Sequence, residues 1–112
     1  MTLFAGLRKI REFERLRLPF LKSVVDFDIV IEIGYEEECG QPLTLKRLYL
    51  LKVCSPGTVR RKLAGLISQG IVIRQPHPND RRASFLLIAP ATLKLIGKYS
   101  NVVASAASLH FE

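Results

Sequence analysis

The sequence has few of the residue patterns that catalytic and metal sites require. Its 112 residues include two cysteines, two histidines and no tryptophan. Cys39 and Cys54 form neither a metal-binding spacing nor a disulfide framework, so we expect two free thiols, with an oxidation-sensitive Cys54 as the alternative. His77 has no partner at a catalytic spacing, and the sequence has no phosphate-binding loop, dinucleotide fingerprint or nucleophile elbow. We therefore expect a protein that is not an enzyme and that holds neither a metal nor a cofactor.

Long apolar runs are also missing. Hydrophobic residues make up 48% of the chain, which is enough for a packed core. Charges interrupt every run well short of a membrane span. In the first residues, MTLFAGLRKIREFERLRL, the charges follow a short apolar patch, which is unlike a signal peptide. We expect one cytoplasmic domain over residues 1–112 that does not enter a membrane.

Acidic residues are scarce where the basic ones gather. The formal net charge is +7, and between residues 44 and 82 the one acidic residue is Asp80. The basic residues of that stretch are Lys46, Arg47, Lys52, Arg60, Arg61, Lys62, Arg74, Arg81 and Arg82. Between residues 20 and 43 the balance reverses, and the acidic residues are Asp26, Asp28, Glu32, Glu36, Glu37 and Glu38. This segregation predicts a basic face for an acidic partner, with the acidic segment lying away from it.

Apolar spacing predicts helices at both ends of the chain. An amphipathic helix is expected over residues 3–18, where Pro19 marks its end, and another over residues 91–109. A buried helix is expected over residues 20–33. Residues 34–42, with Gly34, Gly40 and Pro42, should form a loop or a frayed helix end.

Residues 44–70 carry the signals of two short helices joined by a tight turn. Thr44 suits the N-cap of the first helix, Ser55 followed by Pro56 suits the start of the second, and Gly70 suits the position just past its end. The expected buried stripe of the second helix is Val59, Leu63, Leu66 and Ile67. Its opposite face would carry Thr58, Arg60, Arg61 and Lys62. This is the pattern of a helix-turn-helix.

Residues 71–89 predict a β-hairpin. IVIRQ and ASFLLIA are strand-like, and PHPNDRR connects them. Pro, Asn and Asp suit a turn, but a turn does not need two adjacent arginines at its tip. A hairpin that follows a DNA-reading helix can reach along the duplex as a wing, where arginines meet phosphates or the minor groove. The predicted fold is α+β and mostly α, a winged helix-turn-helix with flanking terminal helices.

The stretch SPGTVRRKLAGLISQGIVIRQPHPNDRRASFLLIA resembles the winged-helix core of the multiple-antibiotic-resistance regulator (MarR) family. The matching elements are a recognition helix over 58–69, Gly70, the pair Ile71-Val72, Arg74, and Asp80 with Arg82. With the preceding helix, the resemblance covers residues 44–89. Members of this family are dimeric transcriptional regulators, mostly repressors, and many respond to small ligands or oxidants.

The resemblance implies a homodimer that binds double-stranded DNA in a sequence-specific way, with a small-molecule effector as a further implied partner. The recognition helix would enter the major groove and Arg82 the minor groove, while Asp80 would hold the wing arginine. The terminal helices would form the dimer. The expected DNA-binding residues are Arg47, Ser55, Gly57, Thr58, Arg60, Arg61, Arg74, Arg81 and Arg82.

A second class of function stays open at this point. A winged helix can also serve as a protein-interaction or assembly module, whose basic face would bind an acidic protein. Titration with random duplex DNA at two salt concentrations separates the two classes, because phosphate contacts make affinity depend on salt.

Overall fold

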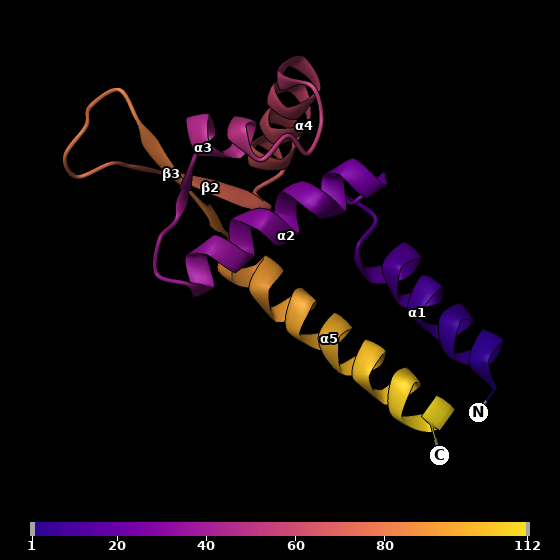
Figure 1. Cartoon of the computed structure of the whole chain (residues 1–112). Coiled ribbons are helices and arrows are strands. Elements are labelled where there is room, and N and C mark those ends of the chain that lie inside the picture. The colour runs from indigo at the N-terminus through magenta and orange to yellow at the C-terminus, as the bar shows by residue number, and fades with distance from the viewer. Residues whose placement is uncertain (1, 112) are drawn as a thin grey trace. The chain divides into compact units, whose positions relative to one another are not determined.

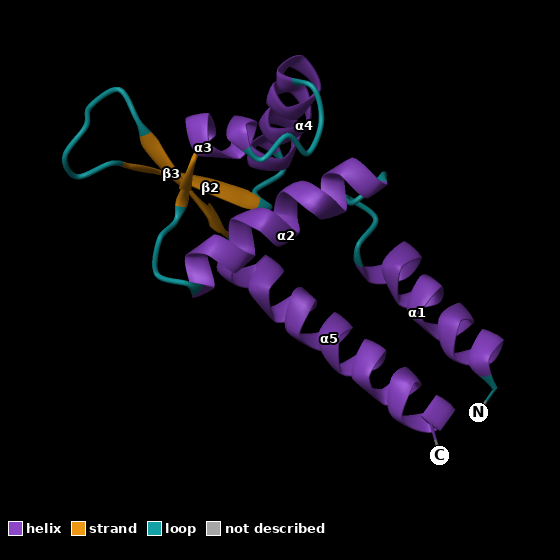
Figure 2. Cartoon of the chain, in the orientation of Figure 1, coloured by secondary structure: helices purple, strands orange, loops and turns teal. Residues whose placement is uncertain are grey.

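The computed structural model describes residues 2–111, with side chains described as far as residue 107 (Figure 1). Its elements are α1 (Leu3–Arg17), α2 (Val24–Glu38), β1 (Leu43–Thr44), α3 (Leu45–Leu50), α4 (Pro56–Ser68), β2 (Val72–Pro76), β3 (Ser84–Ile88) and α5 (Pro90–Phe111). The chain divides into two compact units, Met1–Leu21 with Pro90–Glu112, and Lys22–Ala89. The predicted fold class is confirmed: most of the chain is helical, and the small sheet is antiparallel (Figure 2). Among the described residues, no helix combines the length and apolarity needed to cross a membrane.

In the first unit, α1 packs along α5. The crossing is close because Gly6 lies against Ala106, where a Cβ built on the glycine would be 3.5 Å from the alanine Cβ. Further along, the Phe13 ring stacks on the Tyr99 ring, with centroids 5.8 Å apart. The Tyr99 hydroxyl donates to Glu14 Oε2 at 2.6 Å. Both terminal helices are therefore present as predicted.

In the second unit, α2 starts later and ends later than the sequence suggested. Ser23 is its N-cap, and Ser23 and Asp26 form a capping box, so the helix begins at Val24 rather than near Phe20. The stretch after Ile33, expected as a loop or a frayed helix end, is helical as far as Glu38. Gly34 stays inside the helix, where it packs on Ile88, and the chain leaves the helix only before Gly40, at a φ of +80°.

The sheet has the strand order β1-β3-β2. The predicted hairpin is confirmed, with Val72 opposite Ile88 and Pro76 opposite Ser84. β1 was not predicted, because two residues are too few to show a strand pattern in sequence; it pairs Leu43 with Leu86 on the other edge of β3. Beyond the end of β1, the Glu37 carboxylate of α2 accepts the N–H of Ile88 at 2.9 Å.

The core of the second unit joins the sheet to α2, α3 and α4. Its buried apolar side chains are Ile29, Val30, Ile33, Leu43, Leu48, Val59, Leu63, Leu66, Val72, Leu86 and Ile88. Three of the four residues predicted to form the buried stripe of α4 are in this set, and the fourth, Ile67, is half-buried. This packing fixes which face of α4 points outward.

Candidate nucleic-acid interface

α4 is fixed at both ends by the residues that the sequence indicated. Ser55 Oγ accepts the backbone N–H of Thr58 at 3.4 Å, and Pro56 occupies the first helical turn. At the other end, Gly70 has a φ of +73°, a conformation that glycine adopts without the steric cost other residues bear. The N–H of Ile71 donates to the Leu66 carbonyl at 2.9 Å, which closes the helix end. The predicted caps of α4 are confirmed.

α3 is short and leads into the turn before α4. Thr44 Oγ1 accepts the N–H of Arg47 at 3.3 Å, so Thr44 is the predicted N-cap. Leu48 is fully buried and anchors the helix in the core. Lys52, in the turn, has a φ of +54°, which is uncommon for a residue with a side chain.

The outer face of α4 carries two of the three basic residues of its run. Arg60 and Arg61 are exposed, as is Gly57 near the helix start, and Thr58 is half-buried. Two arginines on the exposed face of a well-anchored helix are accessible to a ligand as large as a nucleic acid.

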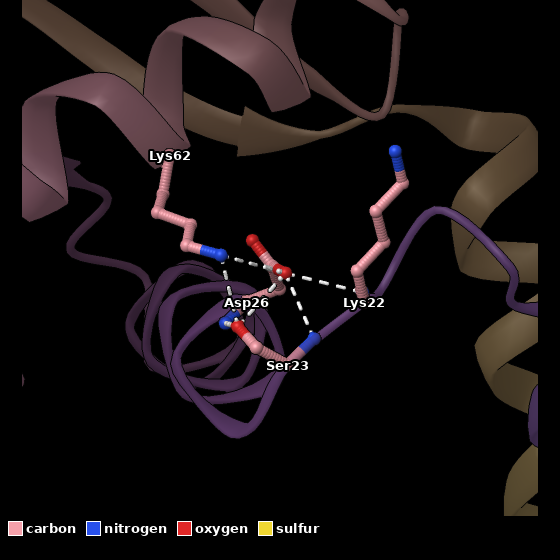
Figure 3. A network of polar contacts seen from close by, with 4 residues as sticks. All are labelled: Lys22, Ser23, Asp26 and Lys62. Carbon is pink, nitrogen blue, oxygen red and sulfur yellow. Dashed lines mark hydrogen bonds and ion pairs between the residues drawn. The ribbon is translucent and has the colours of Figure 1, made fainter.

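Lys62, which the sequence placed on the same outer face, lies elsewhere. Its Nζ is 3.4 Å from Asp26 Oδ2 and 3.1 Å from Ser23 Oγ, at the start of α2 (Figure 3). Asp26 Oδ2 also accepts the backbone N–H groups of Lys22 and Ser23 at 3.1 and 3.0 Å. The prediction for Lys62 was wrong, because a carboxylate distant in sequence turns this side chain back onto α2.

The acidic segment does not lie away from the basic one, contrary to the prediction. Besides the Asp26–Lys62 pair, Glu36 Oε2 of α2 lies 3.5 Å from Arg47 Nη2. Arg47 is exposed, so this pair contributes little to stability and leaves the guanidinium accessible. α2 thus neutralises part of the basic stretch from within the unit.

The wing loop is held by its own polar groups. Asp80 Oδ1 accepts the backbone N–H of Arg82 at 2.9 Å, and the Asp80 carbonyl accepts the N–H of Ala83 at 3.2 Å. Asp80 therefore holds Arg82 by its backbone; over the described residues 2–111, no ion pair joins the two side chains. His77 packs its ring on Phe85, with centroids 4.6 Å apart. Arg81 and Arg82 are both exposed.

A groove of about 700 Å³ runs between α3, α4 and the wing. Its basic residues are Lys46 and three predicted site residues, Arg60, Arg74 and Arg82, and its acidic one is Asp80. Its floor is apolar. The other predicted DNA-binding residues lie outside it; they are Arg47, Ser55, Gly57, Thr58, Arg61 and Arg81. Residues that lie as far apart in the sequence as Thr44 and Leu86 thus line one concave surface.

Tyr49 is a site residue that the sequence reasoning missed. It lines the groove from α3, and its hydroxyl oxygen accepts a hydrogen bond from Arg60 Nε at 3.1 Å. This hydrogen bond is the main cause that raises the pKa of Arg60 above its ordinary value. No signal in the sequence could have found this pair, because Arg60 lies 11 residues away from Tyr49 and only the fold brings the two side chains together.

The two cysteines form no second site with the other side chains that the structure describes. Cys39 is exposed, Cys54 is half-buried, and both are free thiols. Among the side chains that the structure describes, which end at residue 107, no three His, Cys, Asp or Glu residues are grouped so that they could hold a metal ion.

Solved structures similar to this chain include transcriptional regulators. The transcriptional regulator Tm0710 from Thermotoga maritima is 26% identical, with 91% of this chain and 69% of that chain covered and a TM-score of 0.69. A cysteine-to-serine variant of MarR from E. coli complexed with operator DNA is 22% identical, with 89% and 69% covered and a TM-score of 0.62. RV1404 from Mycobacterium tuberculosis is 14% identical, with 89% and 64% covered and a TM-score of 0.71.

No protein-family model matches the sequence. A comparison with curated protein sequences gave no match. The likeness in structure therefore carries the assignment: the chain has the winged-helix fold of the MarR-type regulators, and the predicted resemblance is confirmed at the level of the fold.

Proposed function

We propose that this chain, which has the fold of MarR-type regulators, is a sequence-specific double-stranded DNA-binding transcriptional regulator that acts as a repressor in the cytoplasm. The observation that carries the proposal is the exposed basic face of α4 beside an arginine-tipped wing, with a concave surface between them. A structural neighbour complexed with operator DNA supports it. A small-molecule effector is part of the proposal through the family resemblance alone.

α4 would enter the major groove with its N-terminal half. Ser55, Gly57 and Thr58 lie at that end, where backbone N–H groups and hydroxyls suit phosphate oxygens. Arg60 and Arg61 follow one turn later, and a guanidinium can make two hydrogen bonds to one guanine. Sequence preference would come from these two arginines.

The wing would contact DNA beside the α4 site. Arg81 and Arg82 are exposed at its tip, and Arg74 lies on β2 along the groove. Arginines favour a narrow, A/T-rich minor groove because its negative potential is enhanced. Arg47 of α3 would add a phosphate contact. The phosphate would compete with the Glu36 carboxylate for the Arg47 guanidinium.

Dimerisation through α1 and α5 would give the protein an operator of useful length. One winged helix reads only a few base pairs, whereas a two-fold dimer reads two half-sites about one helical turn apart. On α1, Leu3, Phe4 and Leu7 expose 47%, 78% and 48% of their surface. Exposed apolar side chains gathered at one helix end are typical of an interface between protein chains. Sedimentation at micromolar concentration tests this part of the proposal.

The main experiment selects bound fragments from random duplex DNA and then measures affinity across a salt series. Each neutralised phosphate should steepen the slope of log affinity against log salt by about 0.9. Arg61→Ala should lower affinity for the selected sequence by about 5-fold or more, since a base contact is worth about 1–3 kcal/mol. Arg15→Ala is the matched control, because it removes an exposed arginine from α1 instead of α4.

An affinity for duplex DNA that stays flat as salt rises would refute DNA binding. Equal effects of the Arg61 and Arg15 variants would refute the assignment of sequence recognition to α4. Absence of duplex binding at low salt would instead favour an acidic protein as the partner of the basic face.

A further inference from the structure

The Arg60 guanidinium is held in place before any ligand binds. Its Nε donates to Tyr49 Oη at 3.1 Å, so a residue of α3 fixes a side chain of α4. The other arginines of α4 and the wing, Arg61, Arg74, Arg81 and Arg82, make no side-chain hydrogen bond or ion pair with any residue of the described chain. Arg60 is thus distinguished from its neighbours by a partner and not by its exposure.

The atom that Tyr49 engages decides what remains free. A guanidinium is planar and presents five N–H donors in a rigid fork, one of them on Nε. With Nε bonded to the tyrosine, both Nη groups stay available at the far end of the fork. Two Nη donors side by side match O6 and N7 of guanine in the major groove.

Tyr49 belongs to a helix that is anchored in the core. Tyr49 follows Leu48, which is fully buried, in a helix that Thr44 caps. It is half-buried, and with Arg60 it lines the groove between α3, α4 and the wing. An acceptor on such a support limits the rotamers of Arg60, so less side-chain freedom is left to lose when DNA binds.

Resting on the proposed function, we propose that Tyr49 is a specificity-determining positioning residue, whose hydroxyl orients Arg60 for two-point recognition of one guanine in each half-site. Tyr49 itself makes no base contact. Arg61 has no such partner, so its contribution to DNA binding is independent of Tyr49.

Tyr49→Phe tests the assignment because it removes the hydroxyl and keeps the ring. The affinity of wild type, Tyr49→Phe, Arg60→Ala and the double variant is measured for the selected operator. It is also measured for operators in which each guanine in turn is replaced by adenine, and for random duplex. Thermal unfolding of each variant checks that the fold is intact.

Tyr49→Phe should reduce the preference for one guanine by about 3- to 10-fold, as expected for a lost hydrogen bond and a freed side chain. Arg60→Ala should abolish the preference at the same guanine, and Tyr49→Phe should add nothing to it. The affinity of Tyr49→Phe for random duplex DNA should stay within about 2-fold of the wild-type value, because the variant removes no charge. Arg60→Lys, which keeps the charge but lacks the fork, should lose the guanine preference as Arg60→Ala does.

The matched control uses Arg61. Tyr49→Phe combined with Arg61→Ala should give the product of the two separate effects, because no contact joins these residues. The assignment is overturned if Tyr49→Phe leaves every guanine preference unchanged, or if it acts equally in the Arg60→Ala background. Equal losses on operator and random duplex would assign Tyr49 to a phosphate contact and overturn it as well. A wild-type protein that selects no sequence would refute the proposed function, which is a different result from selective binding that ignores Tyr49.

Discussion

Replacing Asp26 should destabilise the protein far more than replacing Lys62, although the two residues form one ion pair. The Asp26 side chain is 7% exposed, and its Oδ2 accepts from Lys62 Nζ, from Ser23 Oγ and from the backbone N–H groups of Lys22 and Ser23. Lys62 is 21% exposed and donates to Asp26 and to Ser23. The carboxylate therefore serves both the start of α2 and the attachment of α4.

The magnitudes follow from what each substitution leaves behind. Asp26→Ala removes the capping box, at about 1 kcal/mol, and leaves a largely buried ammonium without its anion. Breaking a buried pair in this way costs about 3–5 kcal/mol, and we expect a total at that level because Lys62 keeps some access to water. Lys62→Met keeps the apolar stem and leaves Asp26 with three donors, so its cost should be about 1–2 kcal/mol.

Urea denaturation measures both changes as shifts of the midpoint at constant slope. Asp28→Ala is the control, because Asp28 lies on the same helix and makes no hydrogen bond or ion pair with the described residues. The double variant of Asp26 and Lys62 should be more stable than Asp26→Ala alone, since it removes the orphaned charge. A Lys62→Met loss as large as that of Asp26→Ala would refute this reasoning.

Other predictions concern alkaline pH and two glycines. Burial, and then the hydrogen bond to Glu14, raises the pKa of Tyr99 to about 12, so the folded state retains a proton that the unfolded chain loses near its ordinary value of 10.0. Stability should therefore fall between about pH 10 and 12, and Tyr99→Phe should remove that part of the fall in urea titrations at each pH. Gly65→Ala should raise stability by about 0.5–1 kcal/mol, because an added Cβ meets nothing within 4 Å inside α4. Gly70→Ala should lower stability by about 1 kcal/mol because its φ is +73°, so calorimetry showing the same sign for both glycines would contradict the argument.

Local signals in the sequence were enough to predict most of the fold, but they could not predict pairings between residues far apart in the sequence. Ser55, Pro56 and Gly70 carry the start and end of α4 in their own backbone preferences, and the hairpin follows from its strand pattern and turn residues. β1 escaped prediction because two residues show no periodicity. The start of α2 was misplaced because the apolar residues Phe20 and Leu21 ahead of Ser23 extend the apolar pattern of the helix toward the N-terminus.

The candidate site shows the same division. Exposure of Arg60 and Arg61 could be predicted from the buried stripe of α4, since helical spacing fixes the opposite face. The fate of Lys62 could not, because its partner lies 36 residues away and only the packing of α2 on α4 brings them together. Tyr49 was missed for the same reason: nothing in its neighbours shows which arginine it meets.

The hydrogen bond that the Ile88 N–H donates to the Glu37 carboxylate affects how the sheet can pair with another molecule. An open sheet edge invites a strand from another molecule, and β1 shields only two residues of β3 on that side. A carboxylate seated on the next N–H removes the donor that an incoming strand would need and puts a negative charge in its path. α2 thereby protects this edge of β3 with a hydrogen bond and a negative charge. Strand pairing between two copies of the chain is therefore disfavoured along this edge of β3.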